Sequence, residues 1–249
     1  MGLYDLLLSF FLYGFLGWCT EVAFAAVKTG KFVNRGFLNG PICPVYGIGV
    51  GLVVWLLTPI EDQLLLLYVA SAALVTLLEW ATGVVLDRIF HHKWWDYSDQ
   101  PMNIGGYVCL PFSLVWGLGC VLIMKFLHPI TQKGIDLLPV PLGIVLIIGL
   151  GAALAADISV TVSAILKLNR QLEAMEKVAA ELRELSDKVG SNIYANVSEA
   201  KEKLRARYEE LSLPKSRVSA RLLKAFPRME SRRHKAMLEE LKKRMWGRR

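Results

Sequence analysis

The chain has 249 residues, of which 54% are hydrophobic and 20% are charged, and its mean hydropathy is +0.39. Seven of its 29 Lys and Arg residues and ten of its 22 acidic residues precede residue 167, so that the first part carries a net charge of −3 and the remainder +10. This segregation excludes one evenly mixed soluble domain. It predicts a transmembrane bundle over residues 1–166 and a basic cytosolic tail, helical and in part coiled-coil, over residues 167–249.

Five apolar stretches approach the roughly 20 residues that a helix needs to cross the hydrocarbon core of a bilayer. They are residues 3–27, 41–58, 64–90, 107–127 and 141–166. The first has no charged segment before it and no small-residue cleavage site after it, so we expect it to remain as a helix. The second begins with prolines and glycines, so part of it could line a cavity instead of facing lipid. The predicted fold is an all-α polytopic membrane helix bundle.

The positions of Lys and Arg in the connecting segments predict the orientation of the bundle. Lys28, Lys31 and Arg35 follow the first stretch, Arg88 and Lys93 follow the third, and 22 basic residues follow the fifth. With five spans, these segments share the cytosolic side if the N-terminus lies outside. Lys125 and Lys133 in the fourth connection disagree mildly with this orientation.

Two segments, residues 34–49 and 103–119, resemble each other. Shifted by 70 positions, they align at four pairs, which are Pro41 with Pro111, Tyr46 with Trp116, Gly47 with Gly117 and Gly49 with Gly119. Each segment also follows a long apolar stretch with one glutamate in its second half. The pattern predicts a parallel repeat of two helices about an axis along the membrane normal. Chance similarity between two Gly- and aromatic-rich membrane segments is the alternative.

Three acids, Glu21, Glu79 and Asp157, lie seven to ten residues before the next basic residue. At 1.5 Å per residue, their carboxylates should lie about 10 to 15 Å inside the cytosolic boundary. Acids at this depth are costly against lipid, so we expect them to face the interior of the bundle, with Arg35 and Asn34 as the nearest partners in sequence. A polar cavity is one interpretation. A structural network of helix-packing hydrogen bonds is the other.

The segment 90–103 is rich in aromatic and polar residues. Trp and Tyr beside Lys are typical of an interfacial anchor, but Asp96, Tyr97 and Asn103 add donors and acceptors that anchoring does not require. His91 and His92 are adjacent and make a poor metal pair, and the four cysteines lack metal or redox spacing, so we expect no metal and no cofactor. The candidate cavity residues are Glu21, Asn34, Arg35, Tyr46, Glu79, Trp95, Asp96, Tyr97, Asn103 and Asp157.

The tail contains apolar residues at alternating steps of three and four from residue 168 to 189, which predicts a short coiled coil or a helix that packs on a partner. A break at residues 190–192 precedes a second helix over 195–211. Two basic amphipathic segments follow, around residues 215–226 and 232–245. Such segments favour binding to an anionic membrane surface, a helical partner or a second copy over binding to nucleic acid.

Several motifs carry a family resemblance. They are residues 17–21, 34–47, 94–97, 101–103 and 112–117. They resemble the bacterial membrane family labelled "putative ABC-transporter permease, type IV", over roughly residues 5–160. The resemblance implies a multi-pass protein of the bacterial cytoplasmic membrane and a transport function without a known substrate. The tail lies outside it.

ATP hydrolysis would have to come from a separate subunit, because the one Gly-Lys step, Gly30-Lys31, continues to Phe32 where a Walker A motif needs Ser or Thr. One alternative is a membrane-embedded enzyme for a lipid or lipid-linked substrate, with Glu21 or Glu79 as general base and Arg35 on a phosphate. Another is a non-catalytic scaffold that works through its tail. The resemblance favours a transporter over an enzyme, and the residues identify no catalytic group.

Overall fold

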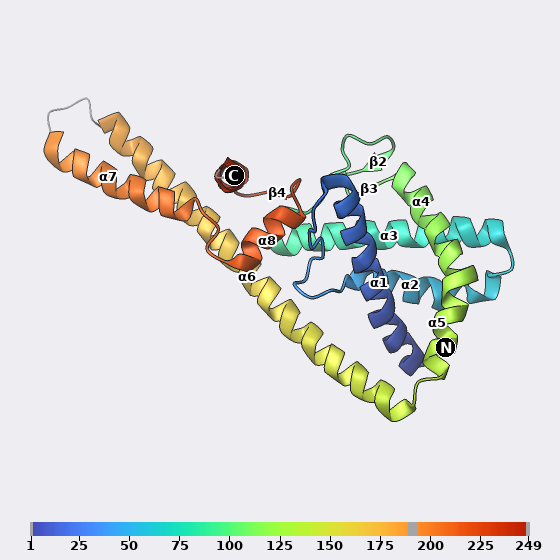
Figure 1. The fold of residues 1–249 in the computed structure, drawn as a ribbon. Coiled ribbons are helices and arrows are strands. Elements are labelled where there is room, and N and C mark those ends of the chain that lie inside the picture. Colours follow the sequence, from blue (N-terminus) through green and yellow to red (C-terminus); the bar gives the residue numbers. More distant parts are fainter. Residues whose placement is uncertain (1, 189–193, 248–249) are drawn as a thin grey trace.

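The computed structural model describes residues 2–188 and 194–247, which form an all-α protein with short strands in two places (Figure 1). Its helices are α1 (Leu3–Thr29), α2 (Pro44–Leu57), α3 (Leu64–Phe90), α4 (Leu110–Leu122), α5 (His128–Asp136), α6 (Val140–Lys188), α7 (Tyr194–Leu211), α8 (Arg217–Ala225) and α9 (Lys235–Gly247). The strands are β1 (His92–Lys93), β2 (Asn103–Ile104), β3 (Val108–Cys109) and β4 (Glu230–Ser231). The predicted fold class is confirmed.

Four helical stretches are long and apolar enough to cross a membrane: Leu3–Thr29, Leu64–Phe90, Leu110–Asp136 and Val140–Ser186. They correspond to the first, third, fourth and fifth predicted spans. The fourth is longer than expected, because a π-helical turn, Ile123–Leu127, joins α4 to α5 without a break. The second predicted span is a shorter apolar helix, Pro44–Ile60, which ends in a 3-10 turn.

Helix α2 packs on α1, and α4 packs on α3, through glycines at equivalent positions of the two repeated segments. A Cβ atom on Gly47 would lie 2.4 Å from the backbone oxygen of Phe10, and one on Gly117 would lie 2.7 Å from the Cβ of Ala72. Only glycine permits so close an approach of two helix backbones. The equivalent rings of Tyr46 and Trp116 also touch edge to face, with centroids 5.8 Å apart. These contacts are consistent with the predicted repeat, which stays a prediction.

Two apolar cores hold the molecule together. The first lies among the membrane helices, around Tyr13, Val53, Leu67 and Met124. The second joins the end of α3 and the loop after it to α6 and the tail, and it consists of Phe90, Trp94, Ile165, Leu168, Leu172, Met175, Val178, Leu211, Leu222, Leu223, Met229, Leu238 and Leu241. The second core makes the tail part of the same folded unit as the bundle.

The tail is continuous with the last span, because α6 runs without interruption through residues 166 and 167, where the sequence predicted a boundary. Helix α7 lies beside the second half of α6 in a projecting hairpin (Figure 1) and agrees with the predicted helix over 195–211. The predicted break at 190–192 lies outside the residues that the structure describes.

The remainder of the tail folds back onto the bundle. Strand β4 pairs with β1 in an antiparallel ladder, with His92 opposite Ser231 and Lys93 opposite Glu230. The apolar faces of α8 and α9 are inside the second core, where Leu222 and Leu238 are 0% exposed. Those faces are therefore not available for insertion into a membrane surface.

Candidate functional site

Glu21, in the second half of α1, is bound by residues from the next two segments of the chain. Arg35 Nε donates to its Oε2 over 3.0 Å, and the Tyr46 hydroxyl donates to its Oε1 over 2.7 Å. Tyr46 lies in the first turn of α2, and its ring packs directly over Gly17 of α1. The short α2 begins at this depth because Cys43 N donates to the backbone oxygen of Gly14, near the middle of α1.

Glu79, in α3, has a similar tyrosine partner but no basic one among the described residues. The Tyr97 hydroxyl donates to Glu79 Oε1 over 3.3 Å. Glu79 Oε2 is buried and has no hydrogen-bond partner in the described part of the chain. A buried oxygen without a donor is costly, and such atoms often mark a functional position.

The two glutamates belong to one polar cluster. Each is close enough to act electrostatically on the tyrosine bound to the other, and Glu21 also acts on Glu79. Burial raises the pKa of the Tyr97 hydroxyl, and the neighbouring Glu79 raises it further, so this hydroxyl stays a donor. We call Glu21, Arg35, Tyr46, Glu79 and Tyr97 the glutamate cluster.

Asp157, the third acid at similar depth, has a different set of partners. It accepts from Asn39 N over 3.0 Å, from Asn39 Nδ2 over 2.7 Å and from Gly40 N over 2.6 Å, and Thr161 also donates to it. These bonds satisfy the backbone of a non-helical loop. Irregular backbone is tolerated at membrane depth only where the protein itself supplies such partners.

The loop between α1 and α2 is further braced by Asn34. Its Oδ1 accepts from Trp18 Nε1 over 2.8 Å and from Gly36 N over 3.0 Å, while its Nδ2 donates to Asn39 O over 2.8 Å. All these bonds lie within the loop or on α1. Asn34 therefore shapes the loop that carries Arg35.

The loop between α3 and α4 uses three more predicted residues for its own structure. Asp96 accepts from the buried ammonium of Lys93 over 2.6 Å and from Ser98. Burial raises the pKa of the Asp96 carboxyl, but the hydrogen bonds from Lys93 and Ser98 outweigh it and lower this pKa to about 2. Asn103 binds the backbone of Ser98 and Gln100, and Trp95 Nε1 donates to Tyr107 O over 2.8 Å. Asp96, Trp95 and Asn103 thus hold the loop that presents Tyr97.

Trp94, in the same loop, is 3% exposed and lies in the second core. Its ring contacts Phe37 of the first loop and Phe226 after α8, with centroids 5.0 and 5.2 Å apart. An interfacial anchor would expose this ring to the headgroup region. Trp94 instead joins both loops to the tail.

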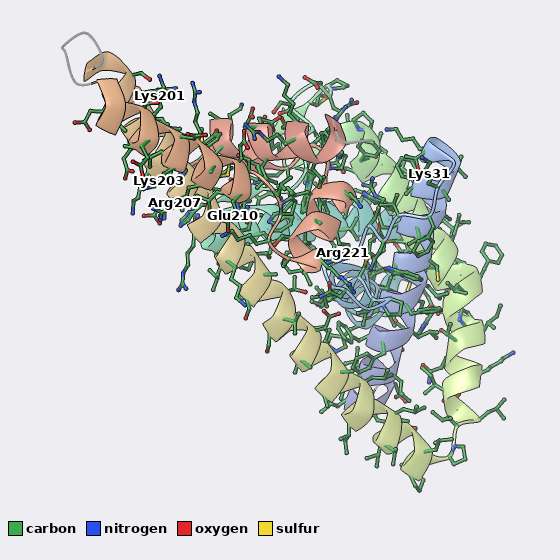
Figure 2. All side chains as sticks on the ribbon, turned by 60° about the vertical axis from the view of Figure 1, so that its left-hand side comes forward. Lys31, Lys201, Lys203, Arg207, Glu210 and Arg221 are labelled. Carbon is green, nitrogen blue, oxygen red and sulfur yellow. The ribbon has the colours of Figure 1, made fainter. Side chains whose placement is uncertain are left out.

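Arg221 and Arg232 of the tail contact the first loop and the end of α3, and sequence reasoning missed both. Arg221 of α8 donates to Asn39 Oδ1, to Gly36 O and to Phe37 O over 2.7 to 3.1 Å (Figure 2). Arg232 donates to Asp87 Oδ2 through Nε over 2.9 Å and through NH2 over 2.8 Å. No local pattern separates these arginines from the many other basic residues of the tail.

The structure therefore divides the ten predicted residues into two groups. Five form the glutamate cluster, and five hold the loops around it: Asn34, Trp95, Asp96, Asn103 and Asp157. The tail covers both loops through Arg221, Arg232 and the β1–β4 ladder. The acids at the centre are suited to bind a proton or a cation, because carboxylate and phenol oxygens are hard ligands.

A family model described as "Putative ABC-transporter type IV" matches residues 8–162. The match begins in α1 and ends in α6, so it contains the whole glutamate cluster and Asp157. The comparisons with curated proteins and with solved structures found no match.

Proposed function

Because the chain belongs to the family described as "Putative ABC-transporter type IV", we propose that it is the membrane component of a transporter and that the glutamate cluster lies on its substrate path. Four helices long and apolar enough to span a membrane make it a multi-pass membrane protein. In this proposal residues 1–166 supply the path, which opens toward the cytosol, and residues 167–249 cover its cytosolic end.

One observation carries the proposal. Glu21 of α1 and Glu79 of α3 come from different helices and are near enough to interact electrostatically, and Glu79 Oε2 lacks a partner among the described residues. Sites between repeated units near the middle of the bilayer are typical of transporters. A cation or a proton would supply the missing partner.

We expect a separate subunit to hydrolyse ATP if transport is driven by it, because the chain has no Walker A sequence. We expect it in the bacterial cytoplasmic membrane with its N-terminus outside and its C-terminus in the cytosol, because basic residues follow the first, third and fifth predicted spans. This orientation requires the shorter helix α2 to complete a crossing as well. Phospholipid surrounds the bundle, and the exposed helix α7 is free for a helical partner or a second copy.

Two observations favour a transporter over an enzyme that acts on a lipid-linked substrate. An enzyme would need free amides to orient a head group, yet Asn34 and Asn103 donate to the backbone of their own loops. Arg35, the candidate phosphate ligand, is paired with Glu21. A scaffold that works only through its tail would not need a buried carboxylate oxygen such as Glu79 Oε2, which has no partner among the described residues.

Complementation of a deletion strain tests the proposal. The contents of inorganic ions and small metabolites in the deletion strain, measured by mass spectrometry, define the transported solute as the one whose level changes. We expect Glu79→Gln, present at the wild-type amount in an immunoblot, to leave that level uncorrected. Glu202→Gln, on the exposed surface of α7, should restore it fully.

Three outcomes would contradict the proposal in different ways. If Glu79→Gln and Glu21→Gln both restore the wild-type solute level, the glutamate cluster does not lie on the substrate path. If the variants only lower the amount of protein in the immunoblot, the cluster is a structural network of hydrogen bonds. A lipid-linked intermediate that accumulates in place of a solute would favour the enzyme.

A further inference from the structure

A polar hollow lies at the point where the end of α3, the middle of α6 and the segment after β4 meet. It has a volume of about 260 Å³. Arg170 of α6 and Arg233 after β4 line it from two sides, and His91 and His234 complete its polar wall. The glutamate cluster contributes no residue to this lining.

The two arginines of the hollow have no partner in the part of the chain that the structure describes. Neither guanidinium forms a hydrogen bond or an ion pair with any residue that the structure describes, and both side chains are exposed. The neighbouring Arg232, in contrast, is fully engaged with Asp87. Each free guanidinium offers five N–H donors in a planar fork, which matches the geometry of a phosphate group.

The acids near the hollow are already paired. Glu173, which also lines it, accepts from Lys177 over 2.7 Å. Glu176 accepts from His234 Nδ1 over 2.5 Å. The uncompensated charge around the hollow is therefore positive, and it favours an anion.

One edge of the hollow is apolar and exposed. Ile89, in the last turn of α3, is 60% exposed, and Leu166 of α6 is 47% exposed. Both helices are long and apolar enough to cross a membrane, and these residues are next in sequence to Arg88 and Lys167. A ligand in the hollow can thus contact the arginines and lipid-exposed apolar side chains at once.

We propose that this hollow binds the phosphate headgroup of an anionic phospholipid, with Arg170 and Arg233 on the phosphate and the acyl chains along Ile89 and Leu166. A free phosphate ion would use the arginines but not the apolar edge, which is why we assign a lipid. The bound lipid bridges the last span to the β4 segment, so it stabilises the docked position of the tail. This assignment does not depend on transport.

Native mass spectrometry of the purified full chain in detergent tests the site, with phosphatidylglycerol and phosphatidylcholine as probes. Each arginine near a membrane surface adds about fivefold to the affinity for anionic lipid. We therefore expect Arg170→Gln with Arg233→Gln to weaken phosphatidylglycerol binding about 25-fold. Arg205→Gln with Arg207→Gln, two exposed arginines of α7 (Figure 2 labels Arg207), should leave it unchanged.

Several results would overturn the assignment. The wild type could bind phosphatidylcholine as tightly as phosphatidylglycerol, or the double variant could bind phosphatidylglycerol as tightly as the wild type. Inorganic phosphate could also raise the unfolding temperature of the protein as much as phosphatidylglycerol does. If the double variant does not purify as a single species, the two single variants decide. Each should lose about fivefold, and unchanged affinity in both would exclude the site.

Discussion

The carboxylate of Asp157 shows how one side chain can hold irregular backbone within a membrane bundle. Asn39 and Gly40 donate backbone N–H groups that no helix or sheet satisfies, and both point at Asp157. Lipid offers no replacement for these bonds. Asp157 therefore acts as a cap for the first loop, in contrast to Glu79, whose Oε2 atom has no partner in the described chain.

We expect Asp157→Ala to lower the free energy of unfolding by about 2 to 6 kcal/mol, because it leaves two partly buried N–H groups unpaired at roughly 1 to 3 kcal/mol each. Asp157→Asn keeps one acceptor oxygen and should lose less. Chemical denaturation of the purified protein in detergent, followed by circular dichroism, measures both.

Ser159→Ala is the matched control for this change, because Ser159 lies two residues further on the exposed side of α6 and bonds only to its own helix. It should differ from the wild type by less than about 0.5 kcal/mol. An Asp157→Ala protein as stable as this control would show that the loop does not need its cap.

At the scale of helices, each of the two similar segments, residues 34–49 and 103–119, packs closely through one glycine. Gly47 faces the backbone of Phe10, and Gly117 faces Ala72. Backbone atoms cannot move aside as a flexible side chain can, so an added methyl group must push the helices apart. The same substitution at Gly51 or Gly119, on the same helices, meets nothing within 4 Å.

We therefore expect Gly47→Ala and Gly117→Ala to destabilise the protein by about 1 to 3 kcal/mol each through overpacking. Gly51→Ala and Gly119→Ala should be neutral or slightly stabilising, because alanine favours a helix over glycine. Thermal unfolding of the four variants in the same detergent measures the difference. Equal effects at all four positions would mean that helix propensity, and not close packing, decides.

The long spans could be predicted from sequence because a run of about 20 apolar residues is a local property. The short α2 could be predicted less well, since its start depends on the bond from Cys43 to Gly14 and on the fit of Tyr46 over Gly17. The positions of Glu21 and Glu79 inside the bundle could be predicted from their distance in sequence to the next basic residue. The loop around it was not, because its partners Asp157 and Arg221 lie more than 100 residues away in sequence.

At the scale of the whole molecule, the second core joins the tail to the bundle. From the sequence we expected the basic helices of the tail to bind a membrane surface or a partner, because no segment could be identified that covers their apolar faces. Those faces instead pack on α6 and on Trp94. A composition shift at residue 167 marks the end of the apolar span, but it does not mark a break in the chain, because α6 continues through it.

The orientation of the whole molecule gives a further prediction. In a variant whose four cysteines are replaced by serine, Asp62→Cys should react with a membrane-impermeant maleimide in intact cells, and Lys203→Cys should react only after permeabilisation. Asp62 lies in the connection between α2 and α3, where its side chain is 95% exposed, and Lys203 lies on α7 (Figure 2). The reverse labelling pattern would invert the proposed topology.

The unbroken α6 has a mechanical consequence. A helix of 49 residues is about 73 Å long at 1.5 Å per residue, with one half among the spans and the other beside α7. A rigid rod transmits rotation along its whole length, so that a tilt of about 10° about its midpoint displaces the far end by roughly 6 Å. If α6 moves as one rigid rod, a small movement of its apolar half would become a larger movement at the end beside α7.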